Sequence, residues 1–375
     1  MESSFELPLV SVIIPAYNAE AFIEITLKSV IRQTYKNIEV LVVDDGSLDR
    51  TAEIVKSIAI KDKRVTLLQQ SNAGVAAARN KAIAHSKGKY IAPIDADDIW
   101  YSENLEKQVQ CMLSSEQSVG LTYAWSAHID EEGLLTGRFD YSQQEGKVYI
   151  PLIVTNFVGN ASACLIRRSC LQEVEGYNCK LRAENAQGCE DWDIYLRIAE
   201  NYEFRVVPDF LIGYRQRISS MSSNLPVMFK SYILVIAEVQ TRHPEIPSII
   251  YQWSASIYYM YLSYKNREAG KHWNCLICLY KSIKLDNLSL LNLYLYKHTL
   301  INFIEWLAKP ITLFIWKDNL SWQQFKRQFR YRYYRSIEIA ELSKKLEKSQ
   351  DLLNLYERLQ EQRLNQIAKN YYQTY

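Results

Sequence analysis

The chain has 375 residues, of which 48% are hydrophobic and 23% charged, a globular composition with length enough for one large or two ordinary domains. The formal net charge is only +2, so composition argues against an electrostatic nucleic-acid binder, and no nucleic-acid partner is expected. Residues 1–12 lack the basic, apolar and small-residue order of a signal peptide, and the 7 cysteines show no regular framework. We therefore expect a cytoplasmic protein with reduced thiols.

The first hundred residues alternate between strand and helix patterns. Four short apolar runs rich in β-branched residues are predicted strands: 10–15, 38–43, 65–68 and 90–94. Three segments between them carry apolar residues at helical spacing: 22–31, 51–58 and 75–84. Near-continuous apolar strands separated by helices predict an α/β fold with a mostly parallel sheet that helices cover on both faces.

Polar or acidic residues follow three of these strands, and ligands of such sheets bind beyond the carboxyl ends of the strands. Asn18 follows the first strand, Asp44 and Asp45 the second, and residues 95–98 the fourth. The three carboxylates at Asp95, Asp97 and Asp98 repel one another, and a divalent cation such as Mg²⁺ or Mn²⁺ would relieve that cost. An acidic loop that caps the next helix would look similar, but the convergence of strand ends favours a metal–phosphate site.

The middle of the chain changes character. Segments 121–127, 134–141 and 161–167 are predicted strands of mixed direction, and 204–207 with 210–214 are expected to form a hairpin. Between these two groups of strands, Glu190 and Asp191 open a predicted helix.

Strand patterns stop near residue 226, and three predicted helices follow: 229–240, 247–264 and 273–283. Phe325 to Arg335 interleaves basic and aromatic residues, and the chain from Glu338 onward has an interrupted apolar stripe at helical spacing. We expect three parts, namely 1–225 as the α/β domain, 226–335 as a helical region and 336–375 as a helical tail. A coiled coil that makes a homo-oligomer is one interpretation of the tail.

Five motifs occur in order, whereas the glycine-rich phosphate loops of P-loop proteins and dinucleotide-binding oxidoreductases are missing. The motifs are Pro15-Ala16-Tyr17-Asn18, Asp44-Asp45-Gly46-Ser47, Asn72-x-Gly74, Asp95-Ala96-Asp97-Asp98 and Glu190-Asp191-Trp192-Asp193. Over about residues 8–225 the chain resembles the family 2 inverting glycosyltransferases of bacterial type, which have a GT-A fold. The resemblance implies a nucleotide-diphosphosugar donor (a UDP-sugar), a divalent Mn²⁺ or Mg²⁺ ion and inversion at the anomeric carbon. It also implies a glycan or lipid-linked glycan acceptor in cell-surface polysaccharide synthesis.

The resemblance assigns the donor nucleotide to the first two strand ends. Pro15, Ala16 and Tyr17 match the segment that lines the nucleotide pocket, although a turn that merely ends the strand is the alternative. Either Asp44 or Asp45 would accept the uracil imide N–H, and the other would cap the following helix.

Beside the phosphates, the resemblance implies one cation and two carboxylates. Arg79 matches the family's basic position next to the nucleotide and phosphates, with a surface helix arginine as the alternative. Asp95 would face the ribose side of the metal site, and Asp97 would bind the metal. Asp98 is expected to cap a helix over 102–111.

Glu190 and Asp191 match the acidic pair that holds the family's catalytic base. Sugar transfer needs the acceptor hydroxyl deprotonated as it attacks, and a carboxylate at a helix N-terminus is stabilised in its ionised form. Asp191 is the preferred base and Glu190 the second choice. A helix cap without a catalytic role is the alternative.

One departure from the family pattern concerns Arg217, which stands where members often carry a histidine after a Tyr-Arg pair. Arginine cannot ligate a metal, but it can pair with diphosphate oxygens. A third protein ligand to the metal is therefore in doubt, and we expect Arg215 or Arg217 to contact the diphosphate.

Two other functions stay open. A polyprenyl phosphate acceptor is already ionised and needs no base, so Glu190 and Asp191 argue against it. A non-catalytic scaffold with a degenerate transferase domain is disfavoured by the intact acidic motifs. The basic and aromatic residues of Phe325 to Arg335 could place the protein peripherally on the inner face of the cytoplasmic membrane, against the alternative of a helix packed on its own protein.

Overall fold

The computed structural model describes residues 7–217, 224–315, 321–322, 325, 339, 341–342 and 355–374. The chain divides into two compact units. The first comprises Met1–Gly133, Gly137–Tyr149 and Phe157–Arg217, and the second comprises Leu134–Thr136, Ile150–Asn156 and Ile218–Tyr375. The domain boundaries expected at 225 and 335 stay predictions.

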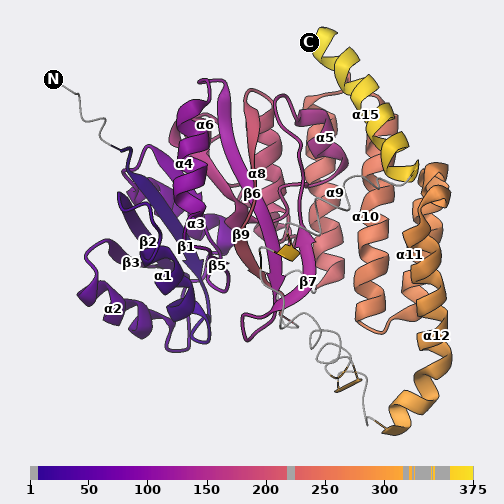
Figure 1. Ribbon diagram of the computed structural model, residues 1–375, viewed down its shortest axis with the longest axis horizontal. Coiled ribbons are helices and arrows are strands. Elements are labelled where there is room, and N and C mark those ends of the chain that lie inside the picture. The colour runs from indigo at the N-terminus through magenta and orange to yellow at the C-terminus, as the bar shows by residue number, and fades with distance from the viewer. Residues whose placement is uncertain are drawn as a thin grey trace. The chain divides into compact units, whose positions relative to one another are not determined.

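The first unit is built on a nine-stranded sheet in the order β3-β2-β1-β4-β8-β6-β9-β5, with β7 paired to β6 (Figure 1). Its strands are β1 (Val10–Ala16), β2 (Ile38–Asp44), β3 (Val65–Gln69), β4 (Tyr90–Pro93), β5 (Ile99–Trp100), β6 (Val119–Ile129), β7 (Leu135–Asp140), β8 (Cys164–Arg167) and β9 (Glu203–Arg215). The first four strands run parallel, whereas β8 is antiparallel to both β4 and β6. The predicted parallel half and the mixed direction of the middle strands are both confirmed.

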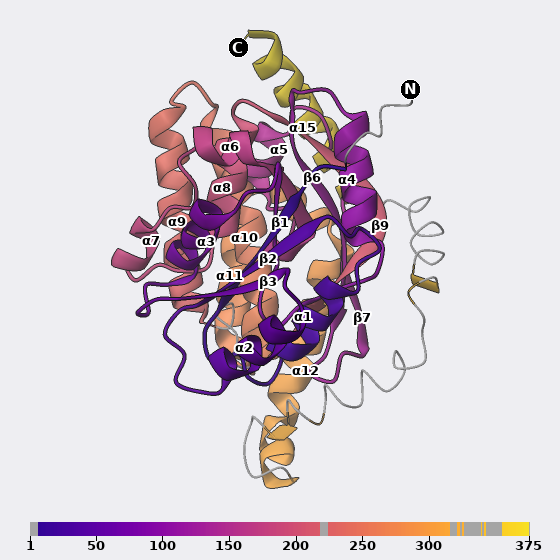
Figure 2. The same cartoon turned by 90° about the vertical axis from the view of Figure 1, so that its left-hand side faces the viewer.

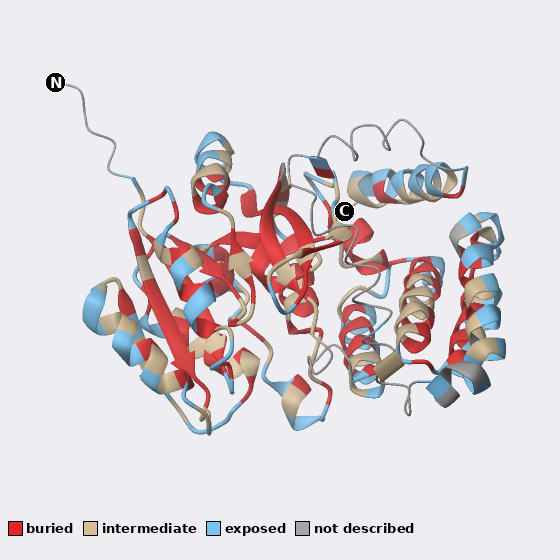
Figure 3. Ribbon diagram, turned by 60° about the horizontal axis from the view of Figure 1, so that its bottom comes forward, coloured by how far each residue is buried: buried red, intermediate tan, exposed pale blue. Residues whose placement is uncertain are grey.

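Helices flank both faces of this sheet, and α3 and α4 lie on opposite sides of it in Figure 2. The helical elements of the unit are α1 (Ile23–Ile31), α2 (Thr51–Lys61), α3 (Val75–His85), α4 (Asn104–Ser114), the 3₁₀ turn η1 (Ala161–Ala163), α6 (Arg168–Glu173), α7 (Lys180–Ala183) and α8 (Glu190–Ala199). Because both faces are covered, the strands carry apolar side chains on both faces, and Ile13, Ile14 and Val42 are fully buried. Figure 3 shows the strands buried and the outward faces of the helices exposed.

The predicted hairpin at 204–214 is wrong, because these residues form one continuous strand, β9. In the pairing with β6, Ala124 lies opposite Val207 but the next residue, Trp125, lies opposite Phe210. A bulge therefore absorbs Pro208 and Asp209, which looked like a turn in the sequence.

The second unit is helical, as predicted. It contains most of α5 (Tyr149–Val154), then α9 (Leu225–Arg242), α10 (Ser248–Glu268), α11 (His272–Leu285), the 3₁₀ turn η3 (Asn287–Leu291), α12 (Leu293–Ile315) and α15 (Leu355–Thr374). Among the described residues, no helix combines the length and the apolar character that crossing a bilayer requires. Most of the basic–aromatic segment 325–335 and much of the proposed coiled-coil stripe lie outside the described residues.

Candidate active site

The parallel register brings the carboxyl ends of β1, β2 and β4 to one edge of the sheet. Ala16 pairs with Asp44 across β1 and β2, and Ile13 pairs with Pro93 across β1 and β4. Just after β1, Asn18 has a positive φ of 47° and exchanges hydrogen bonds of 2.9 Å with the loop after β2. Pro15 and Ala16 therefore end their strand at this edge, and the Tyr17 side chain beside them is half exposed.

Asp44 closes the turn that follows β2. Its Oδ1 accepts the Ser47 N–H at 3.0 Å, and its Oδ2 accepts from Gln69 Nε2 at 3.1 Å. Gly46 makes this turn possible, because its φ is +76° and a Cβ there would lie 2.9 Å from the Asn72 backbone nitrogen. Asp44 is buried, but it accepts only these two hydrogen bonds from the described residues.

Asp45 holds the loop that leads into α3. Its Oδ1 accepts from Gln70 Nε2 at 2.7 Å and from the Ala73 N–H at 2.8 Å, while Oδ2 accepts the Gly74 N–H at 2.8 Å. The expectation that one of the two aspartates caps the next helix, α2, is wrong. The carboxylate at the start of α2 is that of Asp49, whose Oδ1 accepts the Thr51 N–H at 3.0 Å.

Arg79 projects from α3 to the end of β4. Its Nη2 donates to Asp95 Oδ1 at 2.6 Å, and its guanidinium lies 5.1 Å from the centre of the Tyr177 ring. Burial lowers the pKa of Arg79, but the charges of Asp95 and its neighbours more than offset this and raise it, so the side chain stays a fixed cation. Its Nε is buried without a hydrogen-bond partner among the described residues. The surface-arginine alternative is therefore wrong.

Asp97 pairs with the arginine that replaces the expected histidine. Arg217 Nη1 donates to Asp97 Oδ2 at 3.2 Å, and the Arg217 guanidinium also lies 4.9 Å from the centre of the Phe22 ring. Burial and the charge of Asp95 raise the pKa of Asp97, while Arg217 opposes that rise. An additional cation at this point would stabilise the ionised carboxylate further.

Asp98 does not cap the helix expected over 102–111, so that prediction is wrong. The side chain is fully buried, where Oδ1 accepts the Arg215 N–H at 2.8 Å and Oδ2 accepts the Ser162 hydroxyl at 2.5 Å. The same Ser162 oxygen accepts the Asp95 N–H at 3.0 Å. Asp98 therefore anchors the loop that carries the other two aspartates.

The Arg215 side chain is committed to main-chain oxygens. Its Nε donates to the Asp97 carbonyl at 2.6 Å, and its Nη1 donates to the carbonyls of Asp130 at 2.7 Å and Glu131 at 3.0 Å. Arg215 is buried, whereas the Arg217 side chain is 27% exposed. Of the two arginines predicted to meet a diphosphate, Arg217 is the one that solvent reaches.

Glu190 and Asp191 open α8, as predicted. Glu190 Oε2 accepts the Gly188 N–H at 2.7 Å, and Asp191 Oδ1 accepts the Trp192 N–H at 2.8 Å. Burial raises the pKa of Asp191 to about 7, against the lowering effect of the Arg79 charge. A carboxyl with this pKa is ionised for part of the time at neutral pH and can accept a proton there.

The two acidic clusters belong to one electrostatic site. The charges of Arg79 and Asp95 shift the pKa values of both Glu190 and Asp191, with burial as the largest cause in each case. The residues that follow β4 and those that open α8 therefore face a common region of the first unit.

A divalent metal fits the residues after β4 only if other ligands complete its shell. Among the described residues, no group of three His, Cys, Asp or Glu side chains is arranged to hold a metal ion. Asp95 Oδ1 is bonded to Arg79 and Asp97 Oδ2 to Arg217, and the second oxygen of each carboxylate accepts no hydrogen bond from the described residues. Two carboxylate oxygens with phosphate and water are a set that Mg²⁺ or Mn²⁺ accepts.

Three supporting residues were missed in the sequence. Ser162 links two aspartates, Tyr177 lies under Arg79, and Arg182 Nη2 donates to the Asn72 carbonyl at 3.0 Å. None belongs to a motif, and each reaches the site through tertiary packing. Of the three, only Arg182 could have been suspected from the sequence, because it is a cation that lies between two of the motifs.

Comparison with known proteins identifies an enzyme class that agrees with this geometry, the glycosyltransferases. The model of "Glycosyl transferase family 2" matches residues 11–174. The chain is 31% identical over 219 residues to "Uncharacterized glycosyltransferase MJ1057" of Methanocaldococcus jannaschii, covering 57% of this chain and 73% of that protein. It is 30% identical over 237 residues to "Putative teichuronic acid biosynthesis glycosyltransferase TuaG" of Bacillus subtilis, covering 63% of this chain and 90% of TuaG. The chain belongs to glycosyl transferase family 2.

The fold agrees with this membership. A crystal structure of S. aureus TarS (residues 1–349) superposes with a TM-score of 0.53 at 19% identity, covering 78% of this chain and 88% of that one. The predicted GT-A fold with helices at the C-terminal side is confirmed. A shorter match, 45% identical over 111 residues, covers 29% of this chain and 43% of an Escherichia coli protein named "UDP-Glc:alpha-D-GlcNAc-diphosphoundecaprenol beta-1,3-glucosyltransferase WfgD".

Proposed function

We propose that this glycosyltransferase moves a sugar, with inversion, from a UDP-sugar to a hydroxyl of a glycan or lipid-linked glycan. One observation carries the proposal: Asp191, whose pKa burial raises to about 7, opens α8 within the electrostatic reach of Arg79 and Asp95. A proton acceptor poised near neutrality beside a cation and strand-end carboxylates is what sugar transfer between a diphosphate and a hydroxyl requires.

The names of two relatives support the substrate class. WfgD is named for a UDP-Glc donor and an acceptor attached to diphosphoundecaprenol, and TuaG for teichuronic acid biosynthesis. The name of WfgD agrees with a nucleotide-diphosphosugar donor and a lipid-linked acceptor, and the name of TuaG agrees with a role in polysaccharide synthesis.

On the donor side, we assign Asp44 to the base, next to the edge formed by Pro15, Ala16 and Tyr17. Asp45 already accepts three hydrogen bonds, whereas Asp44 accepts two and keeps capacity for an imide N–H. Arg79 and Arg217 offset the negative charge of the diphosphate.

Asp97, with Asp95, would hold a Mg²⁺ or Mn²⁺ ion, which supplies positive charge to the departing diphosphate when bound. Arg215 shapes the same loop from behind through its bonds to main-chain carbonyls. We therefore assign Arg215 a positioning role and leave the contact with the donor to Arg217.

In the reaction itself, the ionised Asp191 carboxylate takes the proton of the acceptor hydroxyl. The acceptor oxygen forms a bond to C1 of the sugar as the bond between C1 and the phosphate oxygen breaks. The nucleoside diphosphate leaves with the electron pair. Glu190, whose pKa burial also raises, is the alternative base.

The experiment is a screen of nucleotide-sugars for transfer or hydrolysis, with Mg²⁺, Mn²⁺ or a chelator present. We expect a UDP-sugar to turn over with metal, and Asp97→Ala and Asp191→Ala to abolish turnover. Asp209→Ala removes a partly exposed carboxylate that pairs with Lys107, and it serves as the control that retains activity. Turnover retained by both site variants would contradict the assignment.

A further inference from the structure

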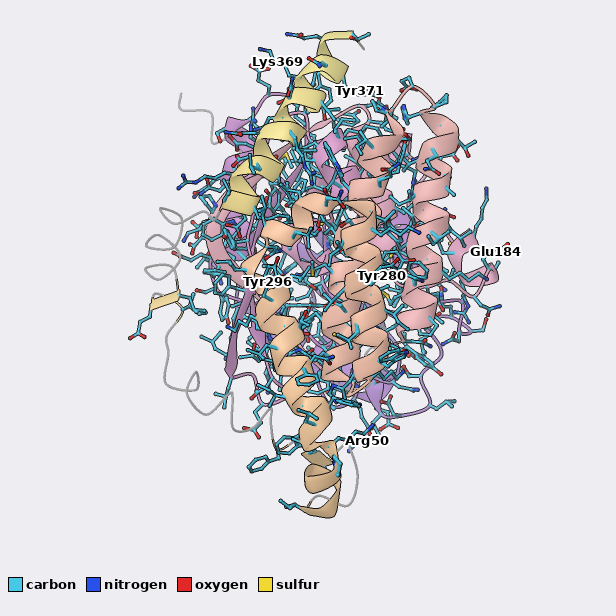
Figure 4. The ribbon with its side chains drawn as sticks, turned by 90° about the vertical axis from the view of Figure 1, so that its right-hand side faces the viewer. Arg50, Glu184, Tyr280, Tyr296, Lys369 and Tyr371 are labelled. Carbon is cyan, nitrogen blue, oxygen red and sulfur yellow. The ribbon has the colours of Figure 1, made fainter. Side chains whose placement is uncertain are left out.

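An exposed apolar surface covers the outer side of α11 and α12 in the second unit. Each of the following side chains is more than half exposed: Trp273, Tyr280, Leu293, Tyr296, Leu300 and Leu307. We call these six residues the outer aromatic face. Figure 4 shows its two tyrosines on the side of these helices that faces the viewer.

Helical periodicity explains why these residues share a face. Along α12, residues 293, 296, 300 and 307 recur at intervals of three, four and seven, which places them on one stripe. On the opposite side of α12, Leu295 forms a buried cluster with Cys275 and Leu279 of α11. The helix thus has apolar side chains on both its packed and its exposed side, and none of the elements that the structure describes covers the exposed ones.

The exposed charges on these two helices are mostly positive. Between residues 272 and 315 the bases are four lysines, Lys281, Lys284, Lys297 and Lys309, and the only acids are Asp286 and Glu305. Asp286 is buried and bonded to Arg363, and Glu305 lies 3.8 Å from Arg267. The lysines are exposed, so solvent next to the face meets positive charge.

We propose that the outer aromatic face lies on an anionic phospholipid surface. Tryptophan and tyrosine have an apolar ring and a polar atom that suit the lipid–water interface, and lysines attract anionic headgroups. A second copy of this chain is a poorer occupant, because a twofold contact would bring the same lysines toward one another. The inference does not depend on the proposed sugar transfer, since it concerns binding alone, but it would place a lipid-linked acceptor close to the enzyme.

The test is co-sedimentation of the full-length protein with vesicles of phosphatidylcholine alone or with an equal part of phosphatidylglycerol. We expect binding to the anionic vesicles that weakens at high salt. Replacing Lys281, Lys284 and Lys297 by glutamine should weaken binding roughly a hundredfold, at about fivefold for each lysine. Trp273→Ser with Leu300→Ser should weaken it by a similar factor through the apolar contribution.

Matched controls come from the first unit, from α2 and residues 62–63 directly after it. Lys56, Lys61 and Lys63 are exposed there, and Ile60 is an exposed apolar residue. Lys-to-Gln changes at the three lysines, and Ile60→Ser, should leave vesicle binding unchanged. Circular dichroism and thermal unfolding confirm that every variant is folded.

Four results would overturn the proposal. The full-length protein could ignore anionic vesicles, or the control variants could lose as much binding as the face variants. Binding could also survive every face variant and disappear only when the basic residues of 325–335 are neutralised. A dimer in light scattering that the serine variants dissociate would instead assign the face to a contact between copies.

Discussion

The ends of β2 and β4 offer a comparison within the first unit. Both strands run parallel, and acidic residues lie at the end of each, at the same edge of the sheet: Asp44 ends β2 and Asp45 follows it, whereas Asp95, Asp97 and Asp98 follow β4. After β2, Asp44 and Asp45 accept hydrogen bonds from backbone and side-chain amides. After β4, Asp95 and Asp97 instead accept hydrogen bonds directly from arginines, whereas the nearest described arginine to Asp45, Arg182, lies 4.0 Å from its Oδ2.

The comparison shows that the hydrogen-bond partners of a carboxylate, rather than the acidic sequence around it, indicate its role. Amide donors fix a carboxylate in a loop, so Asp45, which accepts three such hydrogen bonds, holds the loop before α3, whereas Asp44 keeps capacity for a further donor. The acids after β4 accumulate charge in a partly buried place, and burial with mutual repulsion raises the pKa of both Asp97 and Asp98. Such a site responds to added cations and phosphates.

The strongest test removes one charge after β4 without changing its shape. If Asp97 holds the proposed metal ion, Asp97→Asn should lower the rate of sugar transfer on the order of a thousandfold, because a bound metal stabilises the transition state by several kcal/mol. It should not lower the melting temperature, since the variant loses a carboxylate whose ionisation burial disfavours. Initial rates with and without Mn²⁺, and thermal unfolding, check both points.

Its counterpart after β2 is Asp45→Asn, which should affect folding before it affects chemistry. If Asp97→Asn keeps its activity within about tenfold of the wild type, the distinction between the two strand ends fails. The distinction also fails if Asp45→Asn is inactive but as stable as the wild type.

A second test separates Asp98 from its neighbours on the same loop. Asp98→Ala leaves the Arg215 N–H and the Ser162 hydroxyl without their buried acceptor. Each orphaned donor costs about 1–3 kcal/mol, partly offset by the lost cost of burying the carboxyl, so the free energy of unfolding should fall by roughly 2 kcal/mol. Urea denaturation measures this.

The control for that loss is Asp97→Ala, which removes a more exposed carboxylate from the same loop. We expect a change below about 1 kcal/mol in its free energy of unfolding. Equal stability of Asp98→Ala and the wild type would show that Asp98 does not anchor the loop.

Much of this architecture could be predicted because local patterns determine it. The β-branched runs and helical spacings gave the first four strands, and the order of the acidic motifs gave the family. Asp98 and β9 show where prediction from local sequence patterns fails. A buried aspartate and a helix cap have the same local sequence, and a bulge that contains Pro208 looks like a turn until β6 is placed beside it. Ser162 was invisible for the same reason, because its two partners lie more than sixty residues away.

A third test uses the pH dependence of Asp191. Its pKa, raised to about 7 by burial, predicts that kcat/KM rises with pH up to about 7 and then levels off as the base ionises. Between about pH 4 and pH 7 the Asp191 carboxyl holds its proton in the native state but not in the unfolded chain. The contribution of this group to the free energy of unfolding therefore falls as pH rises through that window.

Asp191→Asn removes that penalty. Above pH 7 the variant should be inactive yet more stable than the wild type, by on the order of 1–2 kcal/mol once screening of the partly exposed side chain is considered. Below about pH 4 the two proteins should have equal stability. Asp209→Asn alters a partly exposed carboxyl and should show neither effect. An Asp191→Asn variant that is less stable than the wild type above pH 7 would refute the assignment.

The smallest expected effect decides between the two aspartates after β2. Asp44→Asn should weaken the binding of uridine diphosphate by roughly tenfold, because an amide can no longer offer a charged acceptor to the imide N–H. Asp45→Asn should leave that affinity within about twofold but lower the free energy of unfolding by about 1 kcal/mol, since the amide group cannot accept all three of its N–H partners. Isothermal titration and urea denaturation of the same two variants give both numbers. The reverse pattern would move base recognition to Asp45, and the hydrogen bond that Arg182 donates to the Asn72 carbonyl would then be the side-chain contact that holds the loop before α3.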